Sequence, residues 1–170
     1  TKTLKLTEKN IDKIVAAMTL EEKANIVVGM SRSLTDAETA NIGYTKKIVP
    51  GAAGTTYPIP RLGVTPMVFA DGPAGVRIST TRKGVDRKFY CTGFPVGTLL
   101  SSTWNDALVE TVGNALGEEA KEYGVDVLLA PGLNIIRNPL CGRNFEYYSE
   151  DPLLTGKIAA AYVRGVQREG

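Results

Sequence analysis

Histidine is absent from the 170 residues, and cysteine occurs only as Cys91 and Cys141. The lack of histidine excludes, within this chain, a Ser-His-Asp triad, an HExxH zinc site and a general base that relies on imidazole. No CxxC pair occurs, so we expect two free thiols rather than a zinc finger or a disulfide framework. The P-loop motif and the GxGxxG motif are also missing, which excludes a nucleotide-binding loop of either kind. We therefore expect no metal ion and no cofactor.

Neither an excess of positive charge nor a long apolar segment is present. Lys and Arg number 20 against 18 Asp and Glu, a net charge of +2. A nucleic-acid binder normally has a basic block, and a membrane span needs about 18 apolar residues in a row, so we expect neither partner. The first ten residues lack the apolar core of a signal peptide, which favours a cytoplasmic location. With 43% hydrophobic and 22% charged residues, the composition is that of a globular domain.

Residues 1–30 predict two helices, and residues 31–66 predict an irregular loop. Apolar residues spaced i, i+3, i+4 and i+7 indicate the first helix: Ile11, Ile14, Val15 and Met18. A capping-box sequence at 19–22 starts the second, whose apolar face is expected to hold Leu20, Ala24, Val27 and Val28. The segment 31–66 is rich in proline and glycine and has no periodicity, although its second half looks more ordered.

From residue 67 onward the pattern alternates between strands and helices. We predict strands at 67–70, more weakly at 94–101, and at 125–130. A helix over 104–123 is predicted after an N-cap at Thr103, and a last helix begins at Asp151-Pro152. The inward residues are expected to be Leu108, Val112, Ala115 and Leu116 in the first of these helices and Ile158, Ala161, Tyr162 and Val166 in the second.

This alternation predicts parallel βα units, an α/β fold. About three strands are too few for a parallel sheet, whose edges and faces must be covered. The sequence therefore predicts part of a larger barrel, and we expect the isolated chain not to fold stably because its strand edges would face water.

In such folds the functional residues gather where strands end. Asp71 ends the first strand, Arg77 follows in a Gly/Pro-rich turn, and Arg143 lies in the polar loop 134–151. A carboxylate accepts hydrogen bonds from adjacent hydroxyls of a sugar, and arginine offers planar donors that hold other hydroxyls or keep Asp71 ionised. The alternative, which spacing alone favours, is that Asp71 caps its own turn and Arg77 merely pairs with it.

The loop 134–151 also carries aromatic and acidic residues. Its aromatics could stack on a sugar, but packing in the core is the commoner role: Phe145, Tyr147 and Tyr148. Glu146 is a further carboxylate, whereas Glu150 and Asp151 fit the N-terminus of the last helix, where negative charge is stabilised.

Five segments together resemble the β-glucosidases of glycoside hydrolase family 3. The string GRNFEYYSEDP is long and specific, and the resemblance extends over nearly the whole chain, from Met18 to Gly170. The matching segments are MTLEEKANIVVGM at 18–30, PIPRLGV at 58–64, ADGPAGVR at 70–77, FPVGTLLSSTWN at 94–105 and APGLNIIRNPLCGRNFEYYSEDP at 130–152.

The resemblance implies a retaining enzyme whose first domain is a (β/α)8-type barrel followed by an α/β sandwich domain. Residues 1–170 would then be the N-terminal portion of that barrel, incomplete in this chain: leading helices at 1–30, a loop at 31–66 and the first βα units at 67–170. It implies that Asp71, Arg77 and Arg143 bind hydroxyls of the terminal non-reducing sugar.

The catalytic residues are expected outside this chain. The resemblance places the nucleophile, an Asp in an SDW-like motif, a Lys-His pair in a KHF-like string and the acid/base Glu all downstream. Two carboxyls about 5–5.5 Å apart serve a retaining mechanism, but we reject Asp71 with Glu146 as that pair because Asp71 lies in the sugar-binding motif. The isolated fragment is therefore expected to be inactive.

The expected activity of the complete protein is release of terminal glucose from β-D-glucosides or oligosaccharides. Its partners are then the small-molecule sugar and the remaining barrel and C-terminal domains. Within the family, β-xylosidase, exo-β-glucanase and β-N-acetylglucosaminidase activities stay open, because the far wall of the pocket lies outside this chain. From another class, a non-catalytic carbohydrate-binding fragment stays open as well.

Overall fold

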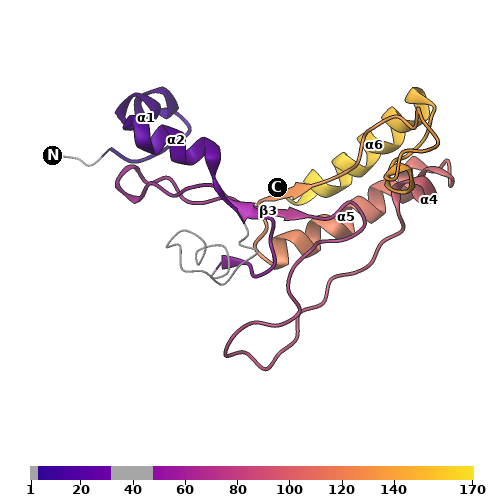
Figure 1. Cartoon of the computed structure of the whole chain (residues 1–170), viewed down its shortest axis with the longest axis horizontal. Helices are drawn as coiled ribbons and strands as arrows, with labels where there is room; N and C mark the ends of the chain where they lie inside the picture. Colours follow the sequence, from indigo (N-terminus) through magenta and orange to yellow (C-terminus); the bar gives the residue numbers. More distant parts are fainter. Residues whose placement is uncertain (1–3, 32–47) are drawn as a thin grey trace.

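The computed structural model of the chain describes residues 4–31 and 48–170, and it has an α/β fold around a small open sheet (Figure 1). The strand order is β1-β2-β3-β4. Strands β1 (Met30–Ser31) and β2 (Gly54–Thr55) are antiparallel to their neighbours, whereas β3 (Val68–Asp71) and β4 (Val127–Leu129) pair in parallel. The expected α/β class is thus confirmed.

The parallel pair is joined by helices, as a parallel connection requires. After β3 the chain forms α4 (Gly97–Ser101) and α5 (Asp106–Glu122) before it returns as β4. Asp126 ties the starts of the two strands together, because its side chain accepts a hydrogen bond from the Val68 N–H at 2.7 Å and its own N–H donates to the Val68 carbonyl at 3.0 Å. The carboxyl ends of β3 and β4 consequently lie at one edge of the sheet, where Asp71 is opposite Leu129.

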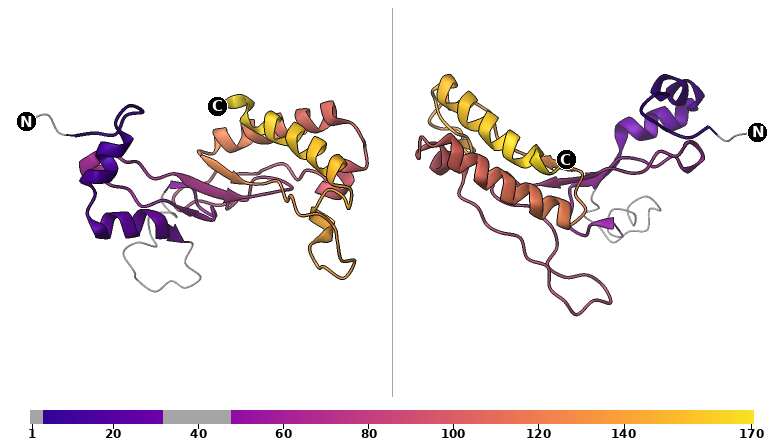
Figure 2. Two further views of the ribbon diagram at one scale, coloured as in Figure 1. Left: turned by 90° about the horizontal axis from the view of Figure 1, so that it is seen from above. Right: turned by 180° about the vertical axis from the view of Figure 1, so that it is seen from behind.

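Helix α6 (Pro152–Val166) lies beside α5 in both orientations of Figure 2. The two backbones approach closely because glycines lie between them. A Cβ added to Gly113 would be 2.4 Å from the Tyr162 carbonyl oxygen, and one added to Gly165 would be 2.2 Å from the carbonyl oxygen of Glu110. Only glycine fits at such distances, so the sequence itself fixes how α5 and α6 meet.

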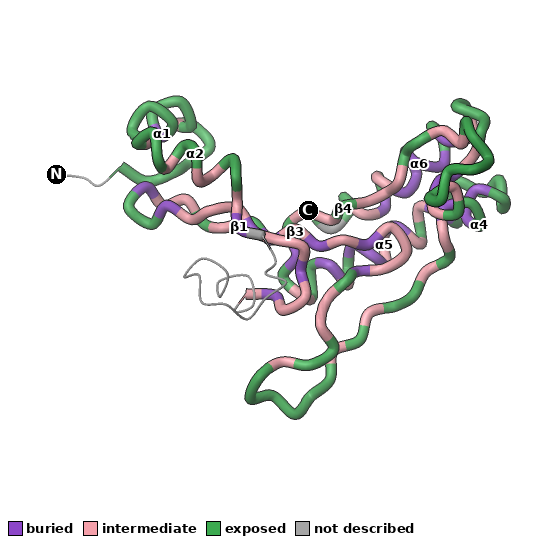
Figure 3. The backbone as a smooth tube through the Cα atoms, in the orientation of Figure 1, coloured by how far each residue is buried: buried purple, intermediate pink, exposed green. Residues whose placement is uncertain are grey.

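The main core lies between the sheet and these two helices (Figure 3). Its largest fully buried side chains include Tyr162, Leu116 and Ile158, so the predicted inward face of the last helix is confirmed. In α5 the predicted face is partly wrong: Leu108 is exposed and Val109 is buried. The side of α5 that faces α6 must carry small residues, because the two backbones approach closely there. This side carries Val109 and Gly113, and Leu108 lies off it.

The two predicted N-terminal helices are confirmed as α1 (Ile11–Ala17) and α2 (Leu20–Val28). The capping box is also confirmed: the Thr19 hydroxyl accepts from the Glu22 N–H at 3.1 Å, and the Glu22 carboxylate accepts from the Thr19 N–H at 2.9 Å. Ile14 is buried in a second, small cluster with Ile59 and Leu62.

The predicted apolar face of α2 does not pack against the described residues. Leu20, Val27 and Val28 are each more than four-fifths exposed. The side of α2 that contacts the small cluster carries Ile26 instead, and Glu22 on this helix forms an ion pair with Arg61. These two contacts therefore determine which side of α2 faces the small cluster.

Two further sequence predictions are corrected in the segment 94–105. The predicted strand over 94–101 is wrong, because residues 97–101 form the helix α4. The N-cap of α5 is Asn105, whose side chain accepts from the Leu108 N–H at 3.0 Å, and the Thr103 hydroxyl instead donates to the Leu100 carbonyl at 2.6 Å. The predicted start at Asp151-Pro152 is confirmed for α6.

The predicted loop at 31–66 lies partly outside the described residues, at 32–47. Its described part includes β2 and a short 3-10 helix, η1 (Pro60–Leu62). Within 4–31 and 48–170, none of the helices is both long and apolar enough to cross a bilayer.

Candidate functional site

Asp71 is the last residue of β3, and a tight turn follows it. The Arg77 N–H donates to the Asp71 carbonyl at 2.9 Å and closes this turn. Inside it, Gly72 has a φ of 155°, and a Cβ at this position would be 2.0 Å from the Gly75 carbonyl oxygen. Glycine is therefore required for the turn that brings residues 71 and 77 together.

The Asp71 carboxylate lies beside the Arg77 guanidinium. The distance from Nη1 to Oδ2 is 3.5 Å, and the side chains of Arg77 and Asp71 are 69% and 48% exposed. This long, exposed pair leaves most of the hydrogen-bonding capacity of the carboxylate open. The structure therefore contains the predicted pair of Arg77 with Asp71. Within the described residues, however, the Asp71 side chain accepts no hydrogen bond from the N–H groups of its own turn.

Arg143 lies immediately before a second 3-10 helix, η2 (Asn144–Glu146), in the loop after β4. Its Nε donates to Oε1 of Glu146, whose side chain is only 14% exposed. This hydrogen bond is the main cause that raises the pKa of Arg143 above its ordinary value, followed by the charges of Glu146, Tyr147 and Asp71. Arg143 is therefore held by Glu146 and remains a cation.

Asp71 and Arg143 follow the carboxyl ends of the two parallel strands: Asp71 is the last residue of β3, and Arg143 lies in the loop after β4. In the part of the chain that the structure describes, no hydrogen bond joins them, and each has another partner. Each group therefore keeps hydrogen-bonding capacity that its own partner does not use.

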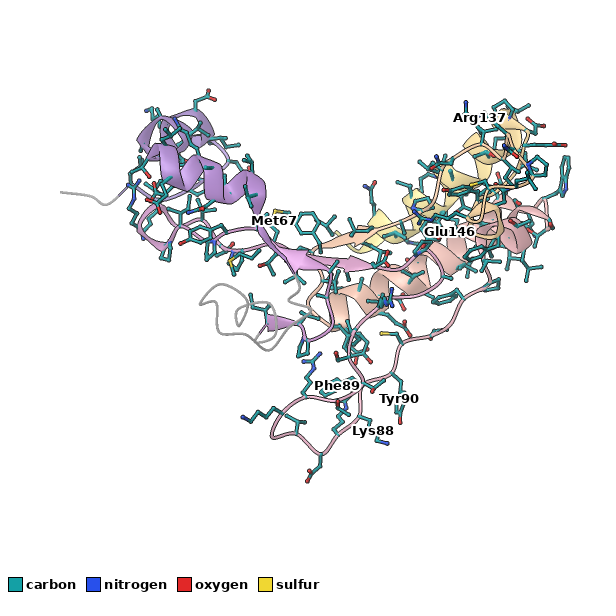
Figure 4. The ribbon with its side chains drawn as sticks, in the orientation of Figure 1. Met67, Lys88, Phe89, Tyr90, Arg137 and Glu146 are labelled. Carbon is teal, nitrogen blue, oxygen red and sulfur yellow. The ribbon has the colours of Figure 1, made fainter. Side chains whose placement is uncertain are left out.

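Helix α4 holds the loop that carries Arg143. The Thr98 hydroxyl lies 2.7 Å from the Tyr147 carbonyl oxygen and 3.1 Å from that of Phe145, and the Ser101 hydroxyl donates to the carbonyl of Tyr148. Figure 4 shows Glu146 and Arg137 at this end of the molecule, close to α4. The position of η2 is therefore fixed by α4, although about 45 residues separate them in the chain.

The aromatic residues of the loop divide between two roles. Tyr147 and Tyr148 are buried, at 8% and 3% exposure, so the core interpretation is confirmed for them. Phe145 is 60% exposed, and the core interpretation is wrong for it. The physical reason is the 3-10 turn of η2, which turns Phe145 outward, whereas Tyr147 is buried and Tyr148 belongs to the main core.

Asp151 and the two cysteines have structural explanations. Asp151 is the N-cap of α6, since its carboxylate accepts from the N–H groups of Leu153 at 2.7 Å and Leu154 at 3.4 Å. Both cysteines are free thiols, as predicted. Burial, with the charges of nearby carboxylates, raises the pKa of Cys91 to about 11. Within the described ranges, no three acidic, cysteine or histidine side chains are grouped as a metal site would require.

Sequence reasoning missed the two residues that position Arg143. Glu146 was treated as a further carboxylate, although its place three residues after Arg143 on a helical turn indicates an ion pair. Thr98 had no sequence signal, because its partners lie in another segment of the chain.

Known proteins resemble the chain in sequence and in fold. Residues 73–170 match the model of the glycosyl hydrolase family 3 N terminal domain. The chain is 40% identical to thermostable β-glucosidase B of Acetivibrio thermocellus over 164 residues, 95% of the chain and 19% of the relative. It is 55% identical to β-glucosidase A of Butyrivibrio fibrisolvens over 109 residues, 64% of the chain and 12% of the relative.

Among solved structures, β-glucosidase 3B from Thermotoga neapolitana in complex with α-D-glucose superposes with a TM-score of 0.84 and 52% identity. The match covers 95% of the chain and 22% of that structure. The chain thus spans about a fifth of the length of the relatives that it matches over most of its own length. By the match over 73–170 and by these relatives, the chain belongs to the glycosyl hydrolase family 3 N terminal domain family.

Proposed function

We propose that the chain supplies part of the terminal-sugar subsite of a retaining β-glucosidase that releases β-D-glucose from the non-reducing end of its substrate. The observation that carries the proposal is that Asp71 ends β3 and Arg143 lies in the loop after β4, so both follow the carboxyl ends of the parallel strands. Relatives that are named β-glucosidases, one of them solved with α-D-glucose, support it.

In this proposal Asp71 is the principal hydrogen-bond acceptor for the sugar. Its carboxylate is half-exposed, and among the described residues it makes only the long contact to Arg77. It can therefore accept hydrogen bonds from two adjacent hydroxyls, and charge-assisted hydrogen bonds are about twice as strong as neutral ones. Arg77 offers the sugar planar donors of its own.

Arg143 approaches the sugar from the neighbouring strand end. Because Glu146 occupies Nε, the Nη groups of the guanidinium remain to donate to ring hydroxyls. A sugar between Asp71 and Arg143 would meet an acceptor on one side and donors on the other. Such contacts aid turnover when they are stronger in the transition state than in the ground state.

The reacting carboxyls are proposed to come from the rest of the protein. A (β/α)8-type barrel would place further strand ends around the same edge and would add a nucleophile and an acid/base beside Asp71. The open β4 edge of the four-stranded sheet is compatible with a barrel of which this chain forms the first units.

The experiment that tests this role is the Asp71→Ala substitution in the complete protein, with 4-nitrophenyl β-D-glucoside as substrate. Loss of two charge-assisted hydrogen bonds predicts that kcat/KM falls by about 3 kcal/mol or more, over a hundredfold. Asp86→Ala is the matched control, because Asp86 is exposed and lies in a different loop. Near-normal turnover of the Asp71 variant would dismiss the assignment.

A further inference from the structure

We infer that a cavity beside Trp104 binds a neutral pyranose ring of an oligosaccharide. The cavity has a volume of about 360 Å³, within the range of about 300–1,000 Å³ that is usual for small-molecule sites. It lies between α4, the turn that follows α4, the segment 148–150 and Leu154 at the start of α6. Its lining combines two aromatic side chains, the exposed Trp104 and the buried Tyr148, with two aliphatic side chains, several hydroxyls and one carboxylate.

Trp104 offers this cavity an exposed aromatic face. The residue is 76% exposed, although tryptophan is among the side chains that proteins bury most. Its backbone has a φ of 54°, a left-handed conformation that no other non-glycine residue adopts in the described ranges. The Trp104 N–H donates to the Ser101 carbonyl at 3.1 Å, so the turn that presents the indole is tied to α4. An unusual backbone conformation that presents an exposed tryptophan favours a binding role.

The polar groups of the lining have free hydrogen-bonding capacity. The Ser149 hydroxyl oxygen accepts from the Asp151 N–H at 3.0 Å, which leaves its own proton available to donate. The Ser102 hydroxyl donates to the Thr98 carbonyl at 2.7 Å, which leaves its oxygen available as an acceptor. The Glu150 carboxylate is exposed and makes no hydrogen bond or ion pair with the residues that the structure describes.

This combination matches the chemistry of a neutral sugar. The C–H face of a pyranose can lie on the indole, whose ring face carries partial negative charge, while its hydroxyls donate to a carboxylate. Neither lysine nor arginine is among the described residues that line the cavity, so an anionic ligand has no counter-charge there. The inference goes beyond the proposed function, because the lining of the cavity does not include Asp71, Arg77 or Arg143.

Binding of cellotetraose to the complete protein carrying Asp71→Ala, measured by isothermal titration calorimetry, tests the inference. In this background the other proposed sugar contact is weakened and hydrolysis is expected to be lost. We expect Trp104→Ala to weaken the affinity about tenfold and Glu150→Gln about threefold. The matched control is Leu99→Ala on α4, which removes an exposed apolar side chain that does not line the cavity and should leave the affinity unchanged.

Thermal unfolding of the same variants separates binding from packing. If Trp104→Ala lowers the midpoint while Glu150→Gln binds cellotetraose like the parent, Trp104 packs against the rest of the protein and the inference is overturned. Equal affinities of the Trp104 and Leu99 variants, or no measurable binding in this background, would also overturn it. Continued hydrolysis of cellotetraose contradicts the role of Asp71 alone, because the comparison of affinities among the variants does not depend on turnover.

Discussion

The guanidinium of Arg143 is hydrogen-bonded through Nε to the carboxylate of Glu146, three residues further along the same 3-10 turn. The arginine side chain is 70% exposed and the glutamate side chain only 14%. The Glu146 side chain is therefore held by its surroundings, whereas most of the Arg143 side chain is exposed. Glu146 thus restrains the direction of the Arg143 guanidinium.

Replacement of Glu146 by Gln in the complete protein should raise KM for the substrate without unfolding the protein. The amide keeps an acceptor for Nε but loses the charge that orients the guanidinium, so we expect KM for a β-glucoside to rise about tenfold with a smaller change in kcat. Steady-state kinetics measure both constants. Glu110→Gln, which weakens the 3.0 Å pair with Arg164 on α5 and α6, is the control and should change neither. If both variants have the same KM and kcat, Glu146 does not position Arg143.

The contact between α5 and α6 predicts a large effect for a single methyl group. Gly113→Ala would place a Cβ 2.4 Å from the Tyr162 carbonyl oxygen, and a backbone atom cannot move aside as a side chain can. We expect a loss of about 1–3 kcal/mol of folding free energy, measured by urea unfolding of the complete protein.

The control for this substitution lies on α6. Gly156→Ala has no atom within 4 Å of the new Cβ and should stabilise the protein or leave it unchanged, because alanine is the better helix former by about 1 kcal/mol. A Gly113 variant as stable as the Gly156 variant would mean that the helices do not meet through their glycines.

The capping box of α2 makes the stability of the N-terminal helices depend on pH in the acidic range. The hydrogen bonds from Arg61 and from the Thr19 N–H lower the pKa of Glu22 from 4.5 to about 2. A lowered carboxyl pKa contributes stability above pH 4.5, and this contribution is lost as the pH falls toward 2.

Thermal unfolding of the complete protein at several pH values checks this dependence. The difference between the parent and Glu22→Gln should be constant above pH 4.5 and shrink toward pH 2. Glu21→Gln, at the neighbouring exposed carboxylate, is the control variant. A parent–variant difference for Glu22 that does not change with pH would contradict the ion pair with Arg61.

The elements that the sequence predicts well are those whose signals are local. The capping box at Thr19 and the Asp151-Pro152 start of α6 each satisfy backbone N–H groups within three residues, so a short window contains the whole cause. Asp71 and Arg77 also lie in one turn and could be brought together from sequence.

The elements that it misses depend on distant partners. Residues 97–101 are helical, and Thr98 and Ser101 meet carbonyls of residues 144–148, which no local pattern contains. Strand β2 has two residues, too few for any periodicity, and it exists because Phe69 and Val68 pair with it. Likewise Leu108 and Val109 are equally apolar, and only the glycine contact with α6 decides between them.

The most direct measurement is a crystal structure of the complete protein with glucose bound. The account predicts one glucose whose hydroxyls lie within about 3.2 Å of both the Asp71 carboxylate and the Arg143 guanidinium. The account would be contradicted by glucose in a well-formed site that neither side chain touches, or by Asp71 and Arg143 directed into separate regions of the protein.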